Sequence, residues 1–160
     1  MTLATAYLEI ANLRVALQGN PELIEIIRER YAGFLTDSAQ ISIELKHLTE
    51  LQPKFGNDEN IPEIRYLENG FAVDQAPFFF IDYNQKTRTG RLSFTSTIHK
   101  KAGSVPPDES PLSFGLRRGI GVLFVTLLAQ DAAPGFHATA LQVNGHGLIA
   151  PGDSGTGKST

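Results

Sequence analysis

Gly152-Asp153-Ser154-Gly155-Thr156-Gly157-Lys158-Ser159-Thr160 is the last stretch of the sequence. Residues 152 to 159 match the pattern G-x-x-x-x-G-K-[ST], which is typical of phosphate-binding loops. The glycines permit positive φ and let a phosphate approach bare backbone, so that successive amide N–H groups form a concave anion site. The pattern predicts that residues 152–160 bind the phosphates of a nucleotide.

Two side chains of this loop carry specific chemistry. Lys158 is expected to reach the β- and γ-phosphates, and the Ser159 hydroxyl is expected to bind Mg²⁺, so ATP and Mg²⁺ are the predicted cofactors. Asp153 is either an outer group near the metal or the acceptor of a local turn hydrogen bond. The apolar run at 147–150 predicts a strand entering the loop, which disfavours the alternative of a Gly/Ser-rich tail after a hairpin.

Such a loop normally opens a helix whose N-terminal amides favour phosphate, and a carboxylate on a later strand normally helps to hold magnesium. Neither element is encoded by the sequence up to Thr160. The expectation is therefore that the chain is the N-terminal part of a longer protein, and that residues 1–160 alone do not catalyse phosphoryl transfer.

Composition describes an ordinary globular protein with few special features. Of 160 residues, 41% are hydrophobic and 19% are charged, the net charge is −3, and there is no cysteine. The charge gives no reason to bind nucleic acid or an anionic membrane, and the lack of cysteine excludes disulfides and thiolate metal sites. The start of the chain lacks a signal-peptide pattern, and the apolar stretch 120–129 is too short to span a bilayer. These features predict a cytoplasmic protein without membrane or nucleic-acid partners.

The first part of the chain predicts an N-terminal α+β domain over residues 1–105. An opening strand is expected over 8–17, with its alternation broken at Ala11-Asn12, and Asn20 and Pro21 are expected to cap and begin a helix. Alternation at 41–46 and the Asn69-Gly70 dipeptide predict further strands and a hairpin. The result is an antiparallel sheet with one helix, and its predicted core comprises Leu13, Val15, Ile26, Ile27, Ile43, Tyr66, Phe71 and Phe79 or Phe80.

A second domain is expected over residues 106–160, after the proline-rich stretch 102–111. A helix is predicted over 111–130, a strand over 137–143, a turn at Asn144-Gly145 and a returning strand over 147–150. Arg117 and Arg118 either steer phosphate or are solvated charges on the helix. His137 at the strand end either contacts the phosphates or is an ordinary packed histidine.

Phe136-His137-Ala138-Thr139-Ala140, the Asn144-Gly145 turn and the loop from Gly152 to Ser159 together resemble the HPr kinase/phosphorylase family. That family has a strand beginning with histidine, a glycine turn and then G-D-S-G-I-G-K-S-E, and His137 precedes Gly152 at the family's spacing. The resemblance covers about residues 111–160. It implies a bacterial serine kinase with a P-loop kinase core related to phosphoenolpyruvate carboxykinases. One departure is Thr160, which stands where the family has glutamate.

The resemblance implies an ATP-dependent phosphotransferase that passes the γ-phosphoryl group to a protein serine or a small-molecule hydroxyl. Lys158 and His137 would be its catalytic residues, and Gly152 to Thr160 would bind nucleotide. The implied partners are a nucleotide, a protein substrate and further copies of the chain in a homo-oligomer. The alternative is a non-catalytic module that senses nucleotide or mediates assembly.

Overall fold

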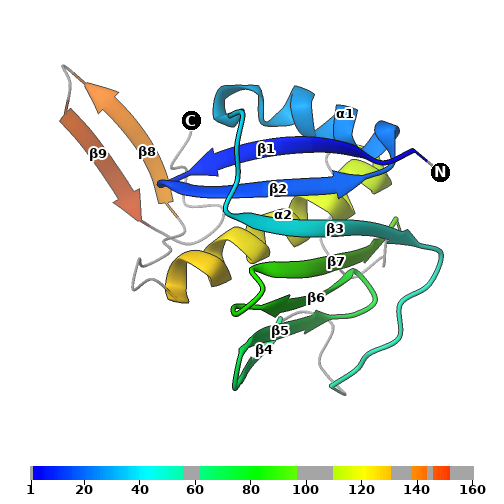
Figure 1. Cartoon of the computed structure of the whole chain (residues 1–160). Coiled ribbons are helices and arrows are strands. Elements are labelled where there is room, and N and C mark those ends of the chain that lie inside the picture. The colour runs from blue at the N-terminus through cyan, green and yellow to red at the C-terminus, as the bar shows by residue number, and fades with distance from the viewer. Residues whose placement is uncertain (1, 56–61, 97–109, 131–137, 144–145, 152–160) are drawn as a thin grey trace. The chain divides into compact units, whose positions relative to one another are not determined.

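The computed structural model describes residues 2–55, 62–96, 110–130, 138–143 and 146–151 (Figure 1). The chain divides into two compact units, Met1–Phe124 and Val125–Thr160. The sequence suggested a boundary near residue 105, whereas this division lies inside a helix. Residues 111–124 of that helix belong with the N-terminal sheet because their apolar side chains pack there.

A seven-stranded mixed sheet forms the N-terminal unit (Figure 1). Its strands lie in the order β1-β2-β3-β7-β6-β5-β4. They span, in that order, Ala4–Ile10, Leu13–Gly19, Ile41–Leu48, Thr89–Thr95, Phe79–Asn84, Gly70–Gln75 and Glu63–Leu67. With two helices, α1 (Pro21–Arg30) and α2 (Pro111–Gln130), the architecture is α+β, as predicted.

The expectation of an antiparallel sheet is wrong at its centre. β2 pairs with β3 in parallel, and β3 pairs with β7 in parallel, whereas the meander β4-β5-β6-β7 and the β1-β2 pair are antiparallel. The parallel pair β2-β3 follows from α1, which carries the chain from the end of β2 back to the start of β3. Parallel strands require such a crossover, and its helix was visible in the sequence although the strand direction was not.

The predicted single strand over 8–17 is two strands. Ala11 and Asn12 have φ of 52° and 66°, and they join β1 to β2 in a tight hairpin in which Ile10 pairs with Leu13. Two positive φ values are typical of the turn that best matches strand twist. The broken alternation marked the right position, but without glycine it gave no clear turn signal.

Both helices cover one face of the sheet. A Cβ added to Gly19 would lie 3.7 Å from Leu23 of α1 and 3.2 Å from the Cβ of Leu45 in β3, and a Cβ on Gly119 of α2 would lie 2.7 Å from Leu92 in β7. Leu45 and Leu92 are paired across β3 and β7, so they point to the same side. We call this the helix-covered face and the other the opposite face.

Asn20 and Pro21 begin α1 as predicted. The Asn20 Oδ1 accepts a hydrogen bond from the Leu23 N–H at 2.9 Å, and Pro21 occupies the first turn, where its missing N–H removes no helical bond. Leu23, Ile24 and Ile27 are buried, while Ile26 is only half-buried, contrary to its predicted place in the core.

Helix α2 has the predicted bounds. Its Ser110 Oγ accepts a hydrogen bond from the Ser113 N–H at 3.2 Å, which caps the helix. Leu116, Ile120, Leu123 and Phe124 are buried. The helix is long enough to cross a membrane, with a mean hydropathy of 1.5 in an 18-residue window, but 44% of that window is buried. Burial of Leu116, Ile120 and Leu123 accounts for part of this apolar composition.

Phe78, Phe79 and Phe80 are all buried, which confirms the predicted place of Phe79 or Phe80 in the core. Leu13, Val15, Ile27, Ile43 and Phe71 are also buried, as predicted. The prediction that Tyr66 belongs to the core is wrong, because this residue is 67% exposed. It lies on β4, which is an edge strand of the sheet among the described residues, and alternation in the sequence cannot reveal an edge position.

A small second core lies on the opposite face. Leu51, Ala72, Ala76 and Phe80 form it, with Leu48 and Phe55 packed against it. The segment that follows β3 is held there by the fully buried Asp74, whose carboxylate accepts hydrogen bonds from the N–H groups of Lys54, Phe55 (2.8 Å) and Ala76 (3.0 Å).

Candidate nucleotide site

The backbone hairpin before the predicted phosphate loop is described, and the loop is not. β8 (Ala138–Val143) and β9 (His146–Pro151) pair antiparallel, which confirms the predicted strand over 147–150. Gly152, Asp153, Ser154, Gly155, Thr156, Gly157, Lys158, Ser159 and Thr160 lie outside the described residues, as does the Asn144-Gly145 turn. Their predicted roles therefore stay predictions.

The register of the β8-β9 hairpin shows which end of the hairpin His137 precedes. Ala138 pairs with Pro151, and Val143 pairs with His146. His137 itself lies outside the described residues, but the residue after it is the strand partner of the residue before Gly152. The backbone thus ties the two predicted site segments to the same end of the hairpin.

The two arginines of α2 are more than solvated charges. The Arg118 guanidinium lies 4.9 Å from the centre of the Phe78 ring, and Arg117 lies 5.3 Å from the centre of the Phe114 ring. Burial, and to a lesser degree the neighbouring Arg117, lowers the pKa of Arg118. A partly buried guanidinium over an aromatic face is a packing element. Its predicted alternative role, steering phosphate, is not tested by these contacts.

His47 is an exposed histidine that contacts Ser96 and Phe94. Its Nε2 lies 3.3 Å from the Ser96 Oγ, and its ring lies 5.5 Å from that of Phe94. Within the part of the chain that is described, no three His, Cys, Asp or Glu side chains gather as a metal site. The predicted Mg²⁺ ligand, Ser159, belongs to the loop outside that part.

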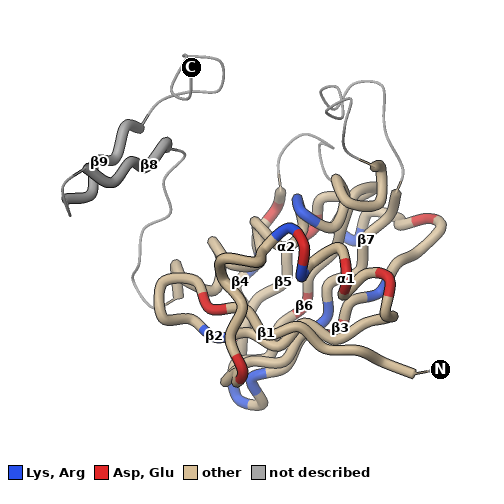
Figure 2. The backbone as a smooth tube through the Cα atoms, turned by 90° about the horizontal axis from the view of Figure 1, so that it is seen from above, with Lys and Arg blue, Asp and Glu red and all other residues tan. Residues whose placement is uncertain are grey.

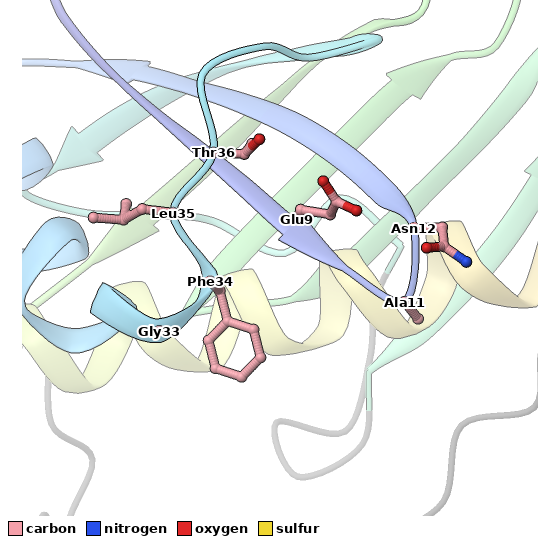
Figure 3. A pocket seen from close by; sticks show the side chains of 7 residues that line it. All are labelled: Glu9, Ala11, Asn12, Gly33, Phe34, Leu35 and Thr36. Carbon is pink, nitrogen blue, oxygen red and sulfur yellow. The ribbon is translucent and has the colours of Figure 1, made fainter.

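Two open hollows are lined entirely by described residues of the N-terminal unit. One, of about 370 Å³, is lined by Glu9, Ala11, Asn12 and the segment from Gly33 to Thr36 (Figure 3). In Figure 3 the Phe34 and Leu35 side chains project in different directions and do not close over Glu9. Glu9 is already bound by the Arg14 Nε at 2.8 Å. A carboxylate at the rim makes this hollow unsuitable for phosphate.

The second hollow, of about 350 Å³, is bordered by Asp82, Asn84 and the β4-β5 turn. Asp82 belongs to a row of charged residues across the opposite face. Its strand partner is Arg91 of β7, and the strand partner of Arg91 in β3 is Glu44. The Arg91 Nε donates to the Glu44 Oε2 at 2.7 Å, and this hydrogen bond raises the pKa of Arg91. Charged residues of both signs lie along the tube in Figure 2, without one dominant sign.

Asp82 gives the sheet a small pH dependence. Partial burial, with a smaller contribution from Glu44, raises the pKa of Asp82 above 3.8, although Arg91 and Lys54 oppose the shift. The folded state then binds the proton more tightly than the unfolded state, so stability falls as pH rises through this pKa. Asp82→Asn is expected to stabilise the protein at pH 7 by less than about 1 kcal/mol, because solvent reaches this partly exposed side chain and screens the effect.

Urea unfolding at pH 7 and at pH 3 measures this effect. The advantage of Asp82→Asn should vanish at the lower pH, where the wild-type carboxyl is also neutral. Asp37→Asn, which removes a charge at an exposed position outside the sheet, is the matched control. A variant that is less stable than wild type at pH 7 would show that attraction to Arg91 outweighs burial.

Asp74 and the charge row of Asp82, Arg91 and Glu44 were missed by sequence reasoning. Asp74 had a signal, because a lone carboxylate continues the apolar run Phe71-Ala72-Val73. Cross-strand pairs such as Glu44 and Arg91 join segments that are distant in the sequence, so no local sequence pattern predicts them. Comparison with known proteins adds no relative: no protein-family model, curated protein or solved structure matches the chain.

Proposed function

We propose that the chain carries an ATP-binding phosphate loop and serves an ATP-dependent phosphotransferase that resembles HPr serine kinases. The supporting observation is that β9 ends at Pro151, directly before Gly152. A strand that runs into G-x-x-x-x-G-K-[ST] is the context in which that pattern binds phosphate. A helix at 147–151 would have argued against it.

The residues of the loop would divide the work. Amides from Asp153 to Ser159 would surround the phosphate oxygens, and the Lys158 ammonium would balance the charge on the β- and γ-phosphates. The Ser159 hydroxyl would hold Mg²⁺, which when bound neutralises charge on the transferred group. His137 would position or protonate a phosphate oxygen, an idea favoured by the pairing of Ala138 with Pro151. The acceptor would be a serine of a protein or a small-molecule hydroxyl.

Lys158→Ala is expected to weaken ATP binding at least about tenfold, because one close charge-assisted contact to phosphate contributes on the order of 1.5–3 kcal/mol. The measurement is calorimetric titration of the purified chain with ATP and Mg²⁺. Incubation with radiolabelled ATP and a candidate acceptor protein then tests phosphoryl transfer.

Lys86→Ala is the matched control, since Lys86 is an exposed lysine in the turn between β6 and β7. It should bind ATP as wild type does. Equal affinity of the wild type and Lys158→Ala would reject the site. Lys158-dependent binding with transfer would support the kinase, whereas Lys158-dependent binding without transfer would support the nucleotide site alone.

A further inference from the structure

The two edge strands of the large sheet, β1 and β4, differ in whether another segment of the described chain bonds to their outer side. At the β1 edge, the segment after α1 crosses back: Leu8 forms a bridge with Leu35, and the Thr36 N–H donates to the Tyr7 carbonyl at 3.0 Å. At the other edge, no strand among the described residues pairs with the outer side of β4. An unpaired edge strand is a template for another strand.

The direction of the main-chain groups on β4 follows from the register. The Gln85 N–H donates to the Asn69 carbonyl at 2.8 Å. The main-chain N–H and C=O groups of Asn69 and of every second residue after it therefore point toward β6. The main-chain groups of Gly70, Ala72 and Asp74 therefore point toward β4. Their strand partners there are Leu67, Arg65 and Glu63. The N–H and C=O groups of Ile64 and Tyr66 are left pointing outward from the sheet.

The side chains at this edge are unusually apolar for an exposed strand. Ile64 is 41% exposed, Tyr66 67% and Leu67 56%. Ile64 and Tyr66 pair with the fully buried Val73 and Phe71, so they continue the apolar rows of the helix-covered face to its margin. Contact with a further strand would complete these rows.

The charges on β4 indicate which strand fits. Glu63 and Arg65 lie on the opposite face and bind each other at 2.7 Å, and the Arg65 guanidinium is held 4.0 Å from the centre of the Phe55 ring. In an antiparallel self-pairing with Ile64 on the two-fold axis, Glu63 stands opposite Arg65 of the other copy, and the reverse. The β4 strand is self-complementary in this register.

We infer that β4 pairs with β4 of a second copy of this chain in an antiparallel, two-fold symmetric dimer. The pairing supplies about four main-chain hydrogen bonds, between the two Ile64 residues and from each Tyr66 N–H to the carbonyl of the partner's Pro62. Pro62 has no N–H, but only its carbonyl is needed. The neighbouring register would place Arg65 against the partner's Arg65, and directly opposed like charges are unfavourable.

Charge reversal tests the register. Sedimentation velocity over a concentration series should show a reversible dimer for the wild type. Glu63→Arg and Arg65→Glu should each raise its dissociation constant about tenfold or more, because both symmetric pairs become repulsive. The double variant Glu63→Arg/Arg65→Glu restores opposite charges and should return the dissociation constant close to the wild-type value. Both side chains are partly exposed, so the fold tolerates these changes.

Crosslinking gives a second measure that uses the absence of native cysteine. Ile64→Cys on the axis places two Cα atoms about 5.5 Å apart, within disulfide range. It should form a covalent dimer on mild oxidation, while Thr87→Cys, in the exposed β6-β7 turn, should not. A wild type that stays monomeric, a double variant no better than the single ones, or equal crosslinking at positions 64 and 87 would overturn the inference. None of these outcomes depends on nucleotide binding.

Discussion

Asp74→Ala is expected to reduce the free energy of unfolding of the N-terminal unit by about 3–5 kcal/mol. The Asp74 carboxylate is fully buried and accepts three main-chain hydrogen bonds, from Lys54, Phe55 and Ala76. Each buried N–H left without an acceptor is unfavourable by about 1–3 kcal/mol, with partial relief where water enters. Urea unfolding followed by circular dichroism measures the loss.

Asp74→Asn separates the loss of hydrogen-bond acceptors from the loss of volume. Its amide keeps one acceptor oxygen but presents an NH₂ group to donors, so an intermediate loss is expected. Asp37→Asn on the exposed surface should change little. A change below about 1 kcal/mol in Asp74→Ala would show that the segment before β4 is held by its apolar contacts instead. Because Arg65 rests on the Phe55 ring, the same variant should also weaken the β4 dimer.

Gly115→Ala is expected to destabilise the protein by about 1–3 kcal/mol, the range for forcing atoms into a packed region. A Cβ at this position would lie 2.3 Å from the Thr95 carbonyl oxygen, which is main chain and cannot rotate away. Helix α2 would have to move off β7. Thermal unfolding provides the measurement.

Gly121→Ala is the matched control in the same helix. Apart from the adjacent backbone of α2, no atom of the described residues lies within 4 Å of a Cβ built there, and the residue is exposed. Alanine is a better helix former than glycine by about 0.8–1.0 kcal/mol, so Gly121→Ala should stabilise. Similar effects of the two substitutions would contradict the proposed close contact between α2 and the sheet.

Local chemistry explains which parts of the fold could be predicted from the sequence. Asn20 and Pro21 act within one helical turn. Asn69-Gly70 correctly predicted the β4-β5 hairpin, although the turn residues are Glu68 and Asn69 and Gly70 opens β5. Gly70 has φ of 151°, and a Cβ there would lie 1.9 Å from the Tyr83 carbonyl oxygen, so glycine is required. Such requirements leave a mark at a single position.

Pairing between strands that are distant in the sequence does not require a particular residue at any one position. Nothing near Ile43 indicates whether its neighbours run parallel or antiparallel, and β3 in fact lies between two parallel partners. The exposed Tyr66 has the same cause, since its alternation matches that of a buried strand. Glycine is a poor helix former, yet Gly115 and Gly119 occur in α2 because the sheet lies close to the helix. For the nucleotide site, the motif predicted the strand before Gly152, and the hairpin agrees.

The parallel joint between β3 and β7 also shapes how the chain can fold. Ser42 meets Thr89 only after the whole segment between them has been closed into a loop, whereas every other pairing of the large sheet joins nearer residues. Closing a loop carries an entropic penalty that grows logarithmically with its length. The meander from β4 to β7 shortens that loop when it forms first, because its own turns are local. The central joint therefore carries the highest contact order in the sheet, a property associated with slow folding.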